Sequence, residues 1–445
     1  MIFKKTMKFQ KFLFRNIFCL TLIGVSSTLY SQSLRIDITG VGQTQMPIAL
    51  APFSSFTKND KKFGQIINDV IQSDLRRTAA FNILPLPPLK PALTTSMELS
   101  NDFFDKWRNL GTHALLIGDI QSVDDSNYIN IKFRLLDTLR SIDLGGLSLQ
   151  TSNNQVEARG IAHRISDFIL ESLTGEPGFF STRLAYVVRK KNKYLLIVSD
   201  SDGHNEKPAL ESSQSLISLA WSPAGDKLAY VSFETGKPVV FVHTLSSGKR
   251  SILANYKGSN SSPAWSPDGK KLAFVLTKDG SSQIYTADEN GKNLKRITKA
   301  RAINTEPNFS HDGKYLFYTS DQGGKPQIYR IRANGRGFPQ RITFKRKFNA
   351  RPVAGPNGEF LAYVTSFEGD FVIATMNLKS KEETILSGGP KDDSPSFAPN
   401  GNWLIFSSRI SGKEILSAVS VDGKVKTRIT MESGDIRSPA WGKLP

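Results

Sequence analysis

The apolar positions of the chain follow one pattern before residue 175 and another after it. Between residues 34 and 175, apolar residues recur at helical spacing in several stretches and form short strands between them. The predicted helices cover 63–75, 102–110 and 161–173, and the predicted strands cover 34–38, 47–53, 81–84, 114–118, 130–136 and 146–151. Helices and strands that alternate in this way favour an α/β domain. Gly175, Pro177 and Gly178 mark its end.

After this linker the chain consists of strands only, and the strands repeat. The phrase Leu-Ala-Tyr-Val, or a close variant, begins six times at intervals of 43 to 45 residues: at Leu184, Leu228, Leu272, Leu316, Leu361 and Leu404. A second phrase, clearest as Trp-Ser-Pro-Asp-Gly-Lys from Trp265, precedes five of these strands and appears a sixth time at Trp441. Two more strands fit in each repeat. Six such repeats predict a six-bladed β-propeller.

The phase of the repeats predicts how the ring closes. The strand at Leu184 has no aromatic-Ser-Pro strand before it, and Trp441 has no Leu-Ala-Tyr-Val strand after it. We therefore expect 438–442 to pair with the strand at Leu184, which removes two open sheet edges. The expected organisation is a signal peptide at 1–33, an α/β domain at 34–175 and the propeller at 180–445.

The strand order also predicts which face of the propeller binds a partner. The Ser-Pro-Asp-Gly turns share one face with the Gly turns between third and fourth strands, because consecutive strands are antiparallel. The longer loops that enter the inner strands ring the other face, at the mouth of the central channel, and such loops often carry binding residues. Their polar candidates are Asn260, Asn304, Glu306, Asn349, Arg351, Asp392, Asp393 and Arg437.

The first 33 residues have the features of a secretory signal peptide. Lys4, Lys5, Lys8, Lys11 and Arg15 precede an apolar run at 17–25, and small and polar residues follow it. The run is far shorter than the ~20 residues that span a bilayer. We expect cleavage near residues 31–33 and an exported chain that is peripheral to the membrane and not inserted in it.

Export changes the interpretation of the net positive charge of the chain. The chain has 58 Lys and Arg against 40 Asp and Glu, a formal net charge of +18, and one cysteine. Removing residues 1–33 lowers the charge to +13 and removes Cys19, so a disulfide framework or a Cys-rich zinc site is excluded. The remaining basic runs, such as 189–191 and 345–347, are short and lie in different repeats. They argue against a nucleic-acid partner and favour an anionic component of the envelope.

Catalytic and metal-binding motifs are missing from this sequence. It has no Gly-x-Ser-x-Gly, and its five histidines are scattered without a His-Glu-x-x-His spacing. The 200–203 stretch, Asp-Ser-Asp-Gly, resembles the start of a calcium loop but lacks the later Glu, and we interpret it as a turn. We expect no catalytic residue, metal or cofactor. The alternative is a periplasmic propeller enzyme or a carbohydrate-binding lectin that uses the central channel.

The export signal, the α/β domain and the propeller together resemble the TolB family of the Tol-Pal system. Matching phrases include 47–53, Asn-Thr-Glu-Pro at 304–307, Pro-Gln-Arg-Ile-Thr at 339–343 and Ser-Pro-Ala-Trp at 438–441. The resemblance implies a non-enzymatic, monomeric protein of the periplasm that links the outer-membrane lipoprotein Pal to TolA. It implies a role in outer-membrane integrity and in constriction at cell division, and it leaves room for other outer-membrane proteins as partners.

The resemblance also implies site residues. Those facing Pal, at the channel mouth, would be Asn260, Ser262, Asn304, Thr305 and Glu306. The segment for TolA would be 34–44, with Leu34, Arg35, Ile36, Asp37 and Ile38 as its family-like part. A short alternating segment of this kind can dock on its own protein or pair with a partner as an added strand. Binding of Pal could bias that equilibrium.

Overall fold

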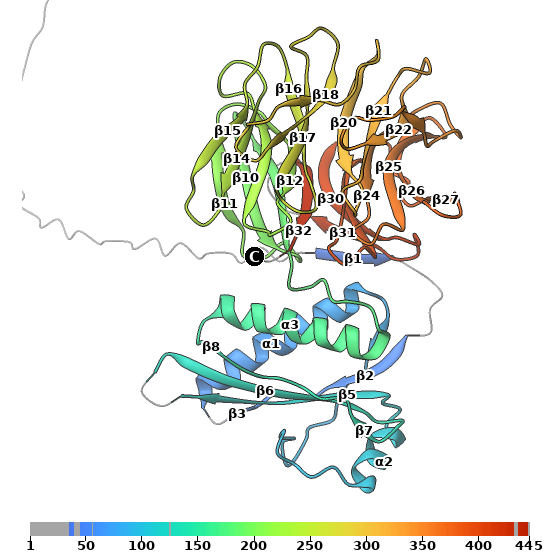
Figure 1. Cartoon of the computed structure of the whole chain (residues 1–445). Coiled ribbons are helices and arrows are strands. Elements are labelled where there is room, and N and C mark those ends of the chain that lie inside the picture. Colours follow the sequence, from blue (N-terminus) through green and yellow to red (C-terminus); the bar gives the residue numbers. More distant parts are fainter. Residues whose placement is uncertain (1–34, 40–44, 56, 124–125, 431–434, 444–445) are drawn as a thin grey trace, which may run out of the picture. The chain divides into compact units, whose positions relative to one another are not determined.

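The computed structural model describes residues 35–39, 45–55, 57–123, 126–430 and 435–443 (Figure 1). The predicted signal peptide lies outside these residues. The chain from Leu34 onward forms one compact unit. It contains a mixed α/β domain followed by a six-bladed β-propeller, as the sequence predicts.

The α/β domain is built on one seven-stranded sheet. Its main strand order is β4-β2-β5-β6-β7, with β3 paired to β5 and β8 paired to β6. Strand β2 is parallel to β4 and β5, whereas β5 and β6 form a long antiparallel pair. The strands are β2 (Met46–Leu50), β3 (Ser54–Ser55), β4 (Phe81–Ile83), β5 (Ala114–Ser122), β6 (Tyr128–Asp137), β7 (Ile142–Asp143) and β8 (Ser148–Ser152).

Three helices cover this sheet: α1 (Lys58–Arg77), α2 (Asn101–Asn109) and α3 (Gln155–Thr174). Thr57 starts α1 with a capping box, because its hydroxyl accepts from the Asp60 amide and Asp60 accepts from the Thr57 amide. Side chains of β2 alternate between the two faces of the sheet: Ile48 and Leu50 join the core formed with α1 and α3, and the alternate residues join the core formed with α2. No helix in the described ranges is long and apolar enough to cross a membrane.

Each blade of the propeller is a four-stranded antiparallel sheet. We number the blades by the chain order of their second strands. Blade 1 is β32 (Asp435–Gly442), β9 (Arg183–Lys190), β10 (Lys193–Asp200) and β11 (Lys207–Ser212); blade 2 is β12 (Leu216–Trp221), β13 (Lys227–Ser232), β14 (Val239–Thr244) and β15 (Arg250–Ala254); blade 3 is β16 (Asn260–Trp265), β17 (Lys271–Leu276), β18 (Gln283–Asp288) and β19 (Lys295–Arg296).

The second half of the ring repeats this plan. Blade 4 is β20 (Asn304–Phe309), β21 (Tyr315–Ser320), β22 (Gln327–Arg332) and β23 (Gln340–Arg341); blade 5 is β24 (Asn349–Ala354), β25 (Phe360–Phe367), β26 (Asp370–Asn377) and β27 (Glu383–Ile385); blade 6 is β28 (Asp393–Phe397), β29 (Trp403–Ile410), β30 (Lys413–Ser420) and β31 (Lys426–Thr430). The first strand named in each blade is its inner strand, which lines the channel.

The predicted closure of the ring is confirmed. Strand β32 pairs antiparallel with β9, and Trp441 lies opposite Leu184. The last strand of the chain therefore completes the first blade, so that neither strand leaves an open edge at the join. The indole Nε1 of Trp441 also donates to Thr182 Oγ1 at 2.8 Å, which ties β32 to the linker before β9.

The segment Arg35–Thr39 forms β1, and β1 pairs with the propeller. It adds a fifth strand to blade 6, antiparallel to β31, with Ile36 opposite Ile429 and Asp37 opposite Arg428. The α/β domain predicted at 34–175 includes this strand, but its partner is the outer edge of a propeller blade. An outer edge strand offers unpaired backbone groups, which an alternating segment can satisfy.

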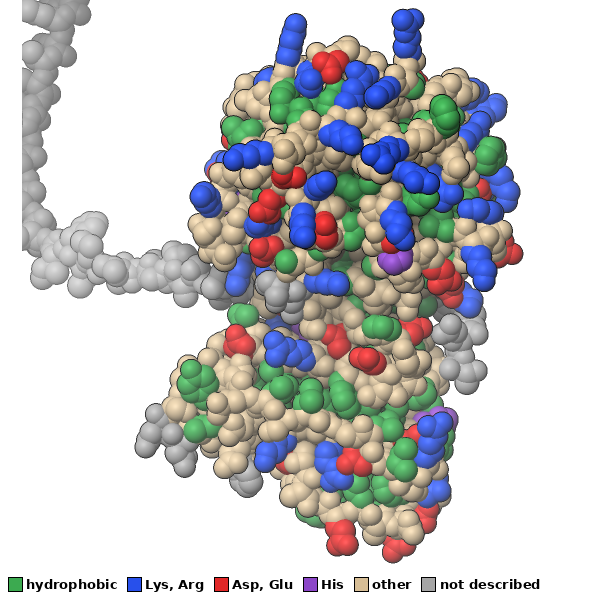
Figure 2. All heavy atoms as spheres, in the orientation of Figure 1, with side chains coloured by type: hydrophobic (Ala, Val, Ile, Leu, Met, Phe, Trp, Pro, Cys, Tyr) green, Lys and Arg blue, Asp and Glu red, His purple; other side chains and the backbone are tan. Residues whose placement is uncertain are grey.

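The two faces of the propeller carry different connections. The mouth face holds the loops that enter the inner strands and the hairpins between second and third strands; for example, the Ser366 amide donates to the Phe348 carbonyl at 3.2 Å. The turn face holds the other hairpins, and it contributes residues that contact the α/β domain, such as Ser201, whose carbonyl accepts from Arg77 Nη1 at 3.1 Å. Lys and Arg side chains are spread over the visible surface of the propeller (Figure 2).

Candidate functional site

The inner strand of every blade contains one residue in the left-handed region, at the same position of the repeat. These residues have φ between 49° and 57° and coincide with a shift in the register between the inner strand and its neighbour. Such a bulge bends a strand and redirects a side chain. The six residues are Ser218, Ser262, Glu306, Arg351, Ser394 and Ser438. All six line the central channel.

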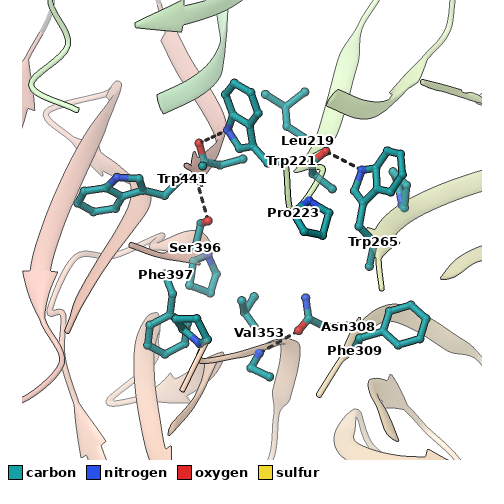
Figure 3. A pocket seen from close by; sticks show the side chains of 18 of the residues that line it. Leu219, Trp221, Pro223, Trp265, Asn308, Phe309, Val353, Ser396, Phe397 and Trp441 are labelled. Carbon is teal, nitrogen blue, oxygen red and sulfur yellow. Dashed lines mark hydrogen bonds between the residues drawn. The ribbon is translucent and has the colours of Figure 1, made fainter. Parts of the chain in front are cut away.

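The channel encloses a cavity of about 500 Å³. Its wall is held together by hydrogen bonds between neighbouring inner strands (Figure 3). The indole Nε1 of Trp265 donates to the Ala220 carbonyl at 3.2 Å, and that of Trp221 donates to the Ala440 carbonyl at 3.1 Å. On the other side of the ring, Asn308 Oδ1 accepts from the Ala354 amide at 2.9 Å. These bonds make the wall a rigid frame on which the bulge residues are presented.

The bulge residues divide the channel into a charged side and a neutral side. Arg351 of blade 5 reaches both neighbouring blades: its Nε lies 3.0 Å from Glu306 Oε1, and its Nη1 lies 3.0 Å from Asp393 Oδ2. Thr319 Oγ1 donates to Glu306 Oε2 at 2.8 Å and fixes that carboxylate further. Blades 1, 2 and 3 present Ser438, Ser218 and Ser262 instead. The wall therefore has a fixed charge pattern that a partner can match.

Two of the predicted mouth residues, Asn260 and Asn304, are fully buried. Asn260 Nδ2 donates to the Pro238 and Tyr256 carbonyls at 3.0 Å, and its Oδ1 accepts from the Tyr256 amide at 2.7 Å. Asn304 Nδ2 donates to Gln283 Oε1 at 3.2 Å. Both side chains thus hold the loops that enter blades 3 and 4, so they shape the mouth from inside.

The other residues predicted to face Pal, Ser262, Thr305 and Glu306, are half-buried, whereas the mouth-loop candidates Asn349 and Asp392 are buried. Ser262 and Glu306 line the channel, whereas Thr305 precedes Glu306 on β20. Arg351, a polar candidate of the mouth loops that is not among the residues expected to face Pal, joins Glu306 to blade 6. A sequence signal for it exists, because it stands directly before Pro352 in the repeat position that Ser262 and Glu306 occupy before their own prolines.

Of the segment predicted to bind TolA, the residues Arg35, Ile36, Asp37 and Ile38 lie in β1 on the edge of blade 6. Leu34 and 40–44 lie outside the described residues. This segment therefore lies on the outer edge of blade 6, whereas the residues of the channel mouth lie on the inner strands.

A buried charge cluster, Asp74, Arg77, Arg159, His163 and Asp202, was not predicted. Its Asp74, His163 and Asp202 side chains are close enough together to hold a metal ion. However, Arg77 Nη2 pairs with Asp74 at 2.7 Å and Arg159 pairs with Asp202, so the two carboxylates already have cationic partners. We therefore interpret the cluster as an ion-pair network that connects α1, α3 and the turn after β10. Its three parts, at 74–77, 159–163 and 202, are too far apart in sequence to form a motif.

Comparison with known proteins assigns the chain to a family. The TolB amino-terminal domain family matches residues 34–144, and the TolB beta propeller domain family matches residues 170–445. The Tol-Pal system protein TolB of Dechloromonas aromatica (strain RCB) is 48% identical over 428 residues, which cover 96% of this chain and 97% of that protein. The Tol-Pal system protein TolB of Azoarcus sp. (strain BH72) is 49% identical over 407 residues and covers 92% of each chain.

A solved structure agrees with these matches. The crystal structure of TolB from Acinetobacter baumannii superposes with a TM-score of 0.82 at 32% sequence identity, and the match covers 92% of this chain and 100% of that one. Both domains, and not the propeller alone, are therefore shared. The chain belongs to the TolB family of the Tol-Pal system.

Proposed function

We propose that this chain is a non-enzymatic, protein-binding component of the Tol-Pal system that acts in the periplasm. It binds the lipoprotein Pal at the mouth of the propeller channel and TolA through its N-terminal segment. In this way it supports outer-membrane integrity and constriction at cell division. Membership of the TolB family supports the assignment to the Tol-Pal system. The structure of the channel wall supports the proposal that a protein partner binds there.

The ion-pair network of Glu306, Arg351 and Asp393 is the observation that carries the proposal. It crosses three blades, the side chains of its members are between 24% and 43% exposed, and Glu306 and Arg351 line the channel. A rigid, partly exposed charge pattern on a concave wall favours recognition of one protein segment over others. Thr305 and Ser262 extend this surface with hydroxyl groups.

A pull-down from an envelope extract tests this site. The bait is the chain from Leu34, as the wild type and as the double variant Thr305→Arg/Glu306→Lys. The matched control is Ser380→Arg/Glu382→Lys, which makes the same charge change at two exposed residues of the turn face. We expect the wild type and the control to recover Pal and the mouth variant to lose it. Recovery of Pal by all three would remove the proposed site.

The N-terminal segment is the proposed contact for TolA. In β1 this segment is an added strand on blade 6, held by backbone pairing to β31. The backbone groups that pair with β31 become available to TolA only if the segment leaves the edge. Deleting 34–44 is expected to abolish binding of TolA and to preserve binding of Pal; a loss of Pal binding would contradict the separation of the two sites.

Export to the periplasm rests on the signal peptide predicted at 1–33. Sequencing the N-terminus of the protein recovered from the periplasmic fraction tests it. A start between residues 32 and 34 is expected, whereas a periplasmic protein that retains the basic residues near its start would contradict cleavage.

A further inference from the structure

The mouth face of blade 5 carries exposed aromatic and basic side chains that the proposed protein contacts leave unused. Phe344, in the loop between β23 and β24, is 71% exposed, and Phe367 and Phe371 flank the β25–β26 hairpin at 37% and 43% exposure. A soluble protein rarely exposes neighbouring large apolar side chains unless they contact something. Phe344 and Phe348 flank the basic run 345–347. A loop that only contacts solvent does not need aromatic residues at these positions.

The loop that carries Phe344 is joined to the β25–β26 hairpin by Phe348 and Arg346. The Phe348 and Phe371 rings pack with centroids 5.0 Å apart, and the Phe348 carbonyl accepts from the Ser366 amide at 3.2 Å. Arg346 lies over the Phe367 ring at 5.5 Å and pairs with Glu383 at 2.8 Å. The loop is therefore held along the hairpin, and its remaining residues point their charges outward. We call the following six exposed residues the aromatic rim: Phe344, Lys345, Lys347, Phe367, Phe371 and Lys391.

The rest of the mouth face adds positive charge. Its loops and hairpins carry exposed cations in other blades as well: Lys191, Lys257, Lys299, Arg301, Lys325 and Lys413. Exposed acids also lie on this face: Glu368 and Asp370 are at the tip of the β25–β26 hairpin beside the rim, and Glu234 and Asp279 of other hairpins pair with Arg250 and Lys278. The cations are spread over several blades and do not converge on one cleft. This distribution suits a broad anionic surface better than a single acidic peptide.

We propose that the mouth face docks on an anionic phospholipid bilayer through the aromatic rim. Phe344, Phe367 and Phe371 would enter the headgroup region, where amphipathic and aromatic groups bind by burial of apolar surface. Lys345, Lys347 and Lys391 would contact lipid phosphates, and the cations of the other blades would add long-range attraction that salt weakens. The contact is peripheral and reversible. It goes beyond the proposed binding of Pal and TolA and requires neither.

Vesicle sedimentation tests the contact with the chain that starts at Leu34. Residues 1–33 are omitted because their apolar run would bind lipid itself, and the chain from Leu34 forms one compact unit. The probe is a vesicle of three parts phosphatidylethanolamine to one part phosphatidylglycerol, compared with phosphatidylethanolamine and phosphatidylcholine at the same ratio. We expect binding to the anionic vesicle only, falling as salt is raised. Equal binding to both vesicles, or to neither, would overturn the proposal.

Variants of the rim have matched partners on the turn face. Lys345→Glu/Lys347→Glu is expected to lower the partition coefficient roughly thirtyfold or more, and Asp370→Lys is expected to raise it. Lys270→Glu/Lys292→Glu changes two exposed lysines of the turn face and should have a much smaller effect. An equal loss in both double variants would show attraction by net charge alone and would overturn the docking face.

Insertion of the aromatic side chain has its own test. Phe338, in the turn between β22 and β23, is 92% exposed on the turn face and serves as the control for Phe344. We expect brominated lipid to quench the added fluorescence of Phe344→Trp and not that of Phe338→Trp. Equal quenching, or none, would contradict insertion of the rim.

If Lys345→Glu/Lys347→Glu weakened binding of purified Pal but left vesicle binding unchanged, the rim would be a protein contact and the bilayer assignment would fall.

Because the probes are pure lipid, failure of these tests would leave the proposed binding of Pal and TolA untouched. All substituted side chains are exposed, so thermal melting of each variant is expected to match the wild type, which separates loss of binding from loss of fold.

Discussion

His163 Nδ1 lies 2.7 Å from Asp74 Oδ2, with both side chains almost completely removed from solvent. Asp202 Oδ2 lies 3.7 Å from the other ring nitrogen of His163. Since Asp74 is on α1, His163 on α3 and Asp202 in the turn after β10, one imidazole stands between two carboxylates from the α/β domain and the propeller. The protonation of His163 is therefore coupled to the stability of the whole unit.

We predict that the contribution of His163 to stability decreases as the pH rises. Burial alone would lower the pKa of His163, but the charge of Asp74, the hydrogen bond to it and the charge of Asp202 together raise that pKa above its ordinary value. A raised pKa in the folded state means that the stabilisation is fully present below the unfolded value of ~6.5 and is lost as the pH rises through the folded value. Denaturant unfolding of wild type and His163→Gln over this window measures the difference.

The cost of His163→Gln is expected to be largest on the acid side of the window, at about 3 kcal/mol for a broken buried ion pair. Arg77, Arg159 and His204 also face the cluster, and they are present in both proteins. A cost that is independent of pH would mean that His163 stays neutral in the folded protein.

A second prediction concerns the two buried asparagines of the mouth. Asn260→Ala and Asn304→Ala are each expected to lower the free energy of unfolding by about 1–3 kcal/mol, because each removes a buried hydrogen bond: the Tyr256 amide loses Asn260 Oδ1, and Gln283 Oε1 loses Asn304 Nδ2. Ser262→Ala is the matched control, since Ser262 is half-buried on the channel wall and its loss should cost far less. If Asn260→Ala weakened Pal binding without any loss of stability, Asn260 would be a direct contact and not a loop anchor.

The repeat explains why so much of the fold could be predicted. Leu184 and Trp441 recur as members of phrases with a fixed spacing, so both the blade count and the pairing of the two ends follow from the sequence. The helix over 63–75 was equally visible, because its apolar residues face one core. These features depend on the local spacing of apolar residues, which can be recognised in a single sequence.

The remaining parts of the site could not be predicted, because they are formed by residues that are distant in the sequence and close together only in the folded protein. The sequence separates Asp74 from Asp202 by more than a hundred residues, and nothing in either neighbourhood indicates the other. Asn260 and Ser262 are two residues apart and both polar, yet one is buried as an anchor and the other lines the channel. The bulge between them decides which side chain faces the cavity, and a bulge has no reliable pattern in one sequence.

A third prediction tests the closure of the ring. Deleting 437–445 removes most of β32, including Trp441 and its partners across from Leu184, and leaves β9 as an open edge inside the channel wall. We expect no cooperative thermal transition for the propeller in this variant. Deleting 443–445 is the matched control, because β32 ends at Gly442 and remains intact. An unchanged melting temperature after the longer deletion would contradict a ring closed by β32.

The fourth prediction concerns the exchange of β1 between blade 6 and a partner. Asp37 lies opposite Arg428 in the β1–β31 register. Side chains at opposed positions of antiparallel strands have Cβ atoms about 4.5–5.5 Å apart, and a disulfide joins Cβ atoms about 3.5–4.5 Å apart, so a small approach of β1 toward β31 allows the bridge. The chain from Leu34 has no cysteine of its own, because Cys19 is the only one in the sequence. The double variant Asp37→Cys/Arg428→Cys can therefore lock β1 on the blade without competing thiols.

We expect the oxidised double variant to lose binding of TolA and to keep binding of Pal, and reduction to restore binding of TolA. The reason is that the backbone groups of β1 that face β31 can pair with TolA only when β1 leaves the blade, and the cross-link prevents this. Titration of purified TolA and Pal against both redox states measures this, with Asp37→Cys alone as the control for the substitution itself. If the oxidised variant bound TolA as well as the reduced one, release of β1 would not be required, and the contact for TolA would have to lie elsewhere on the chain.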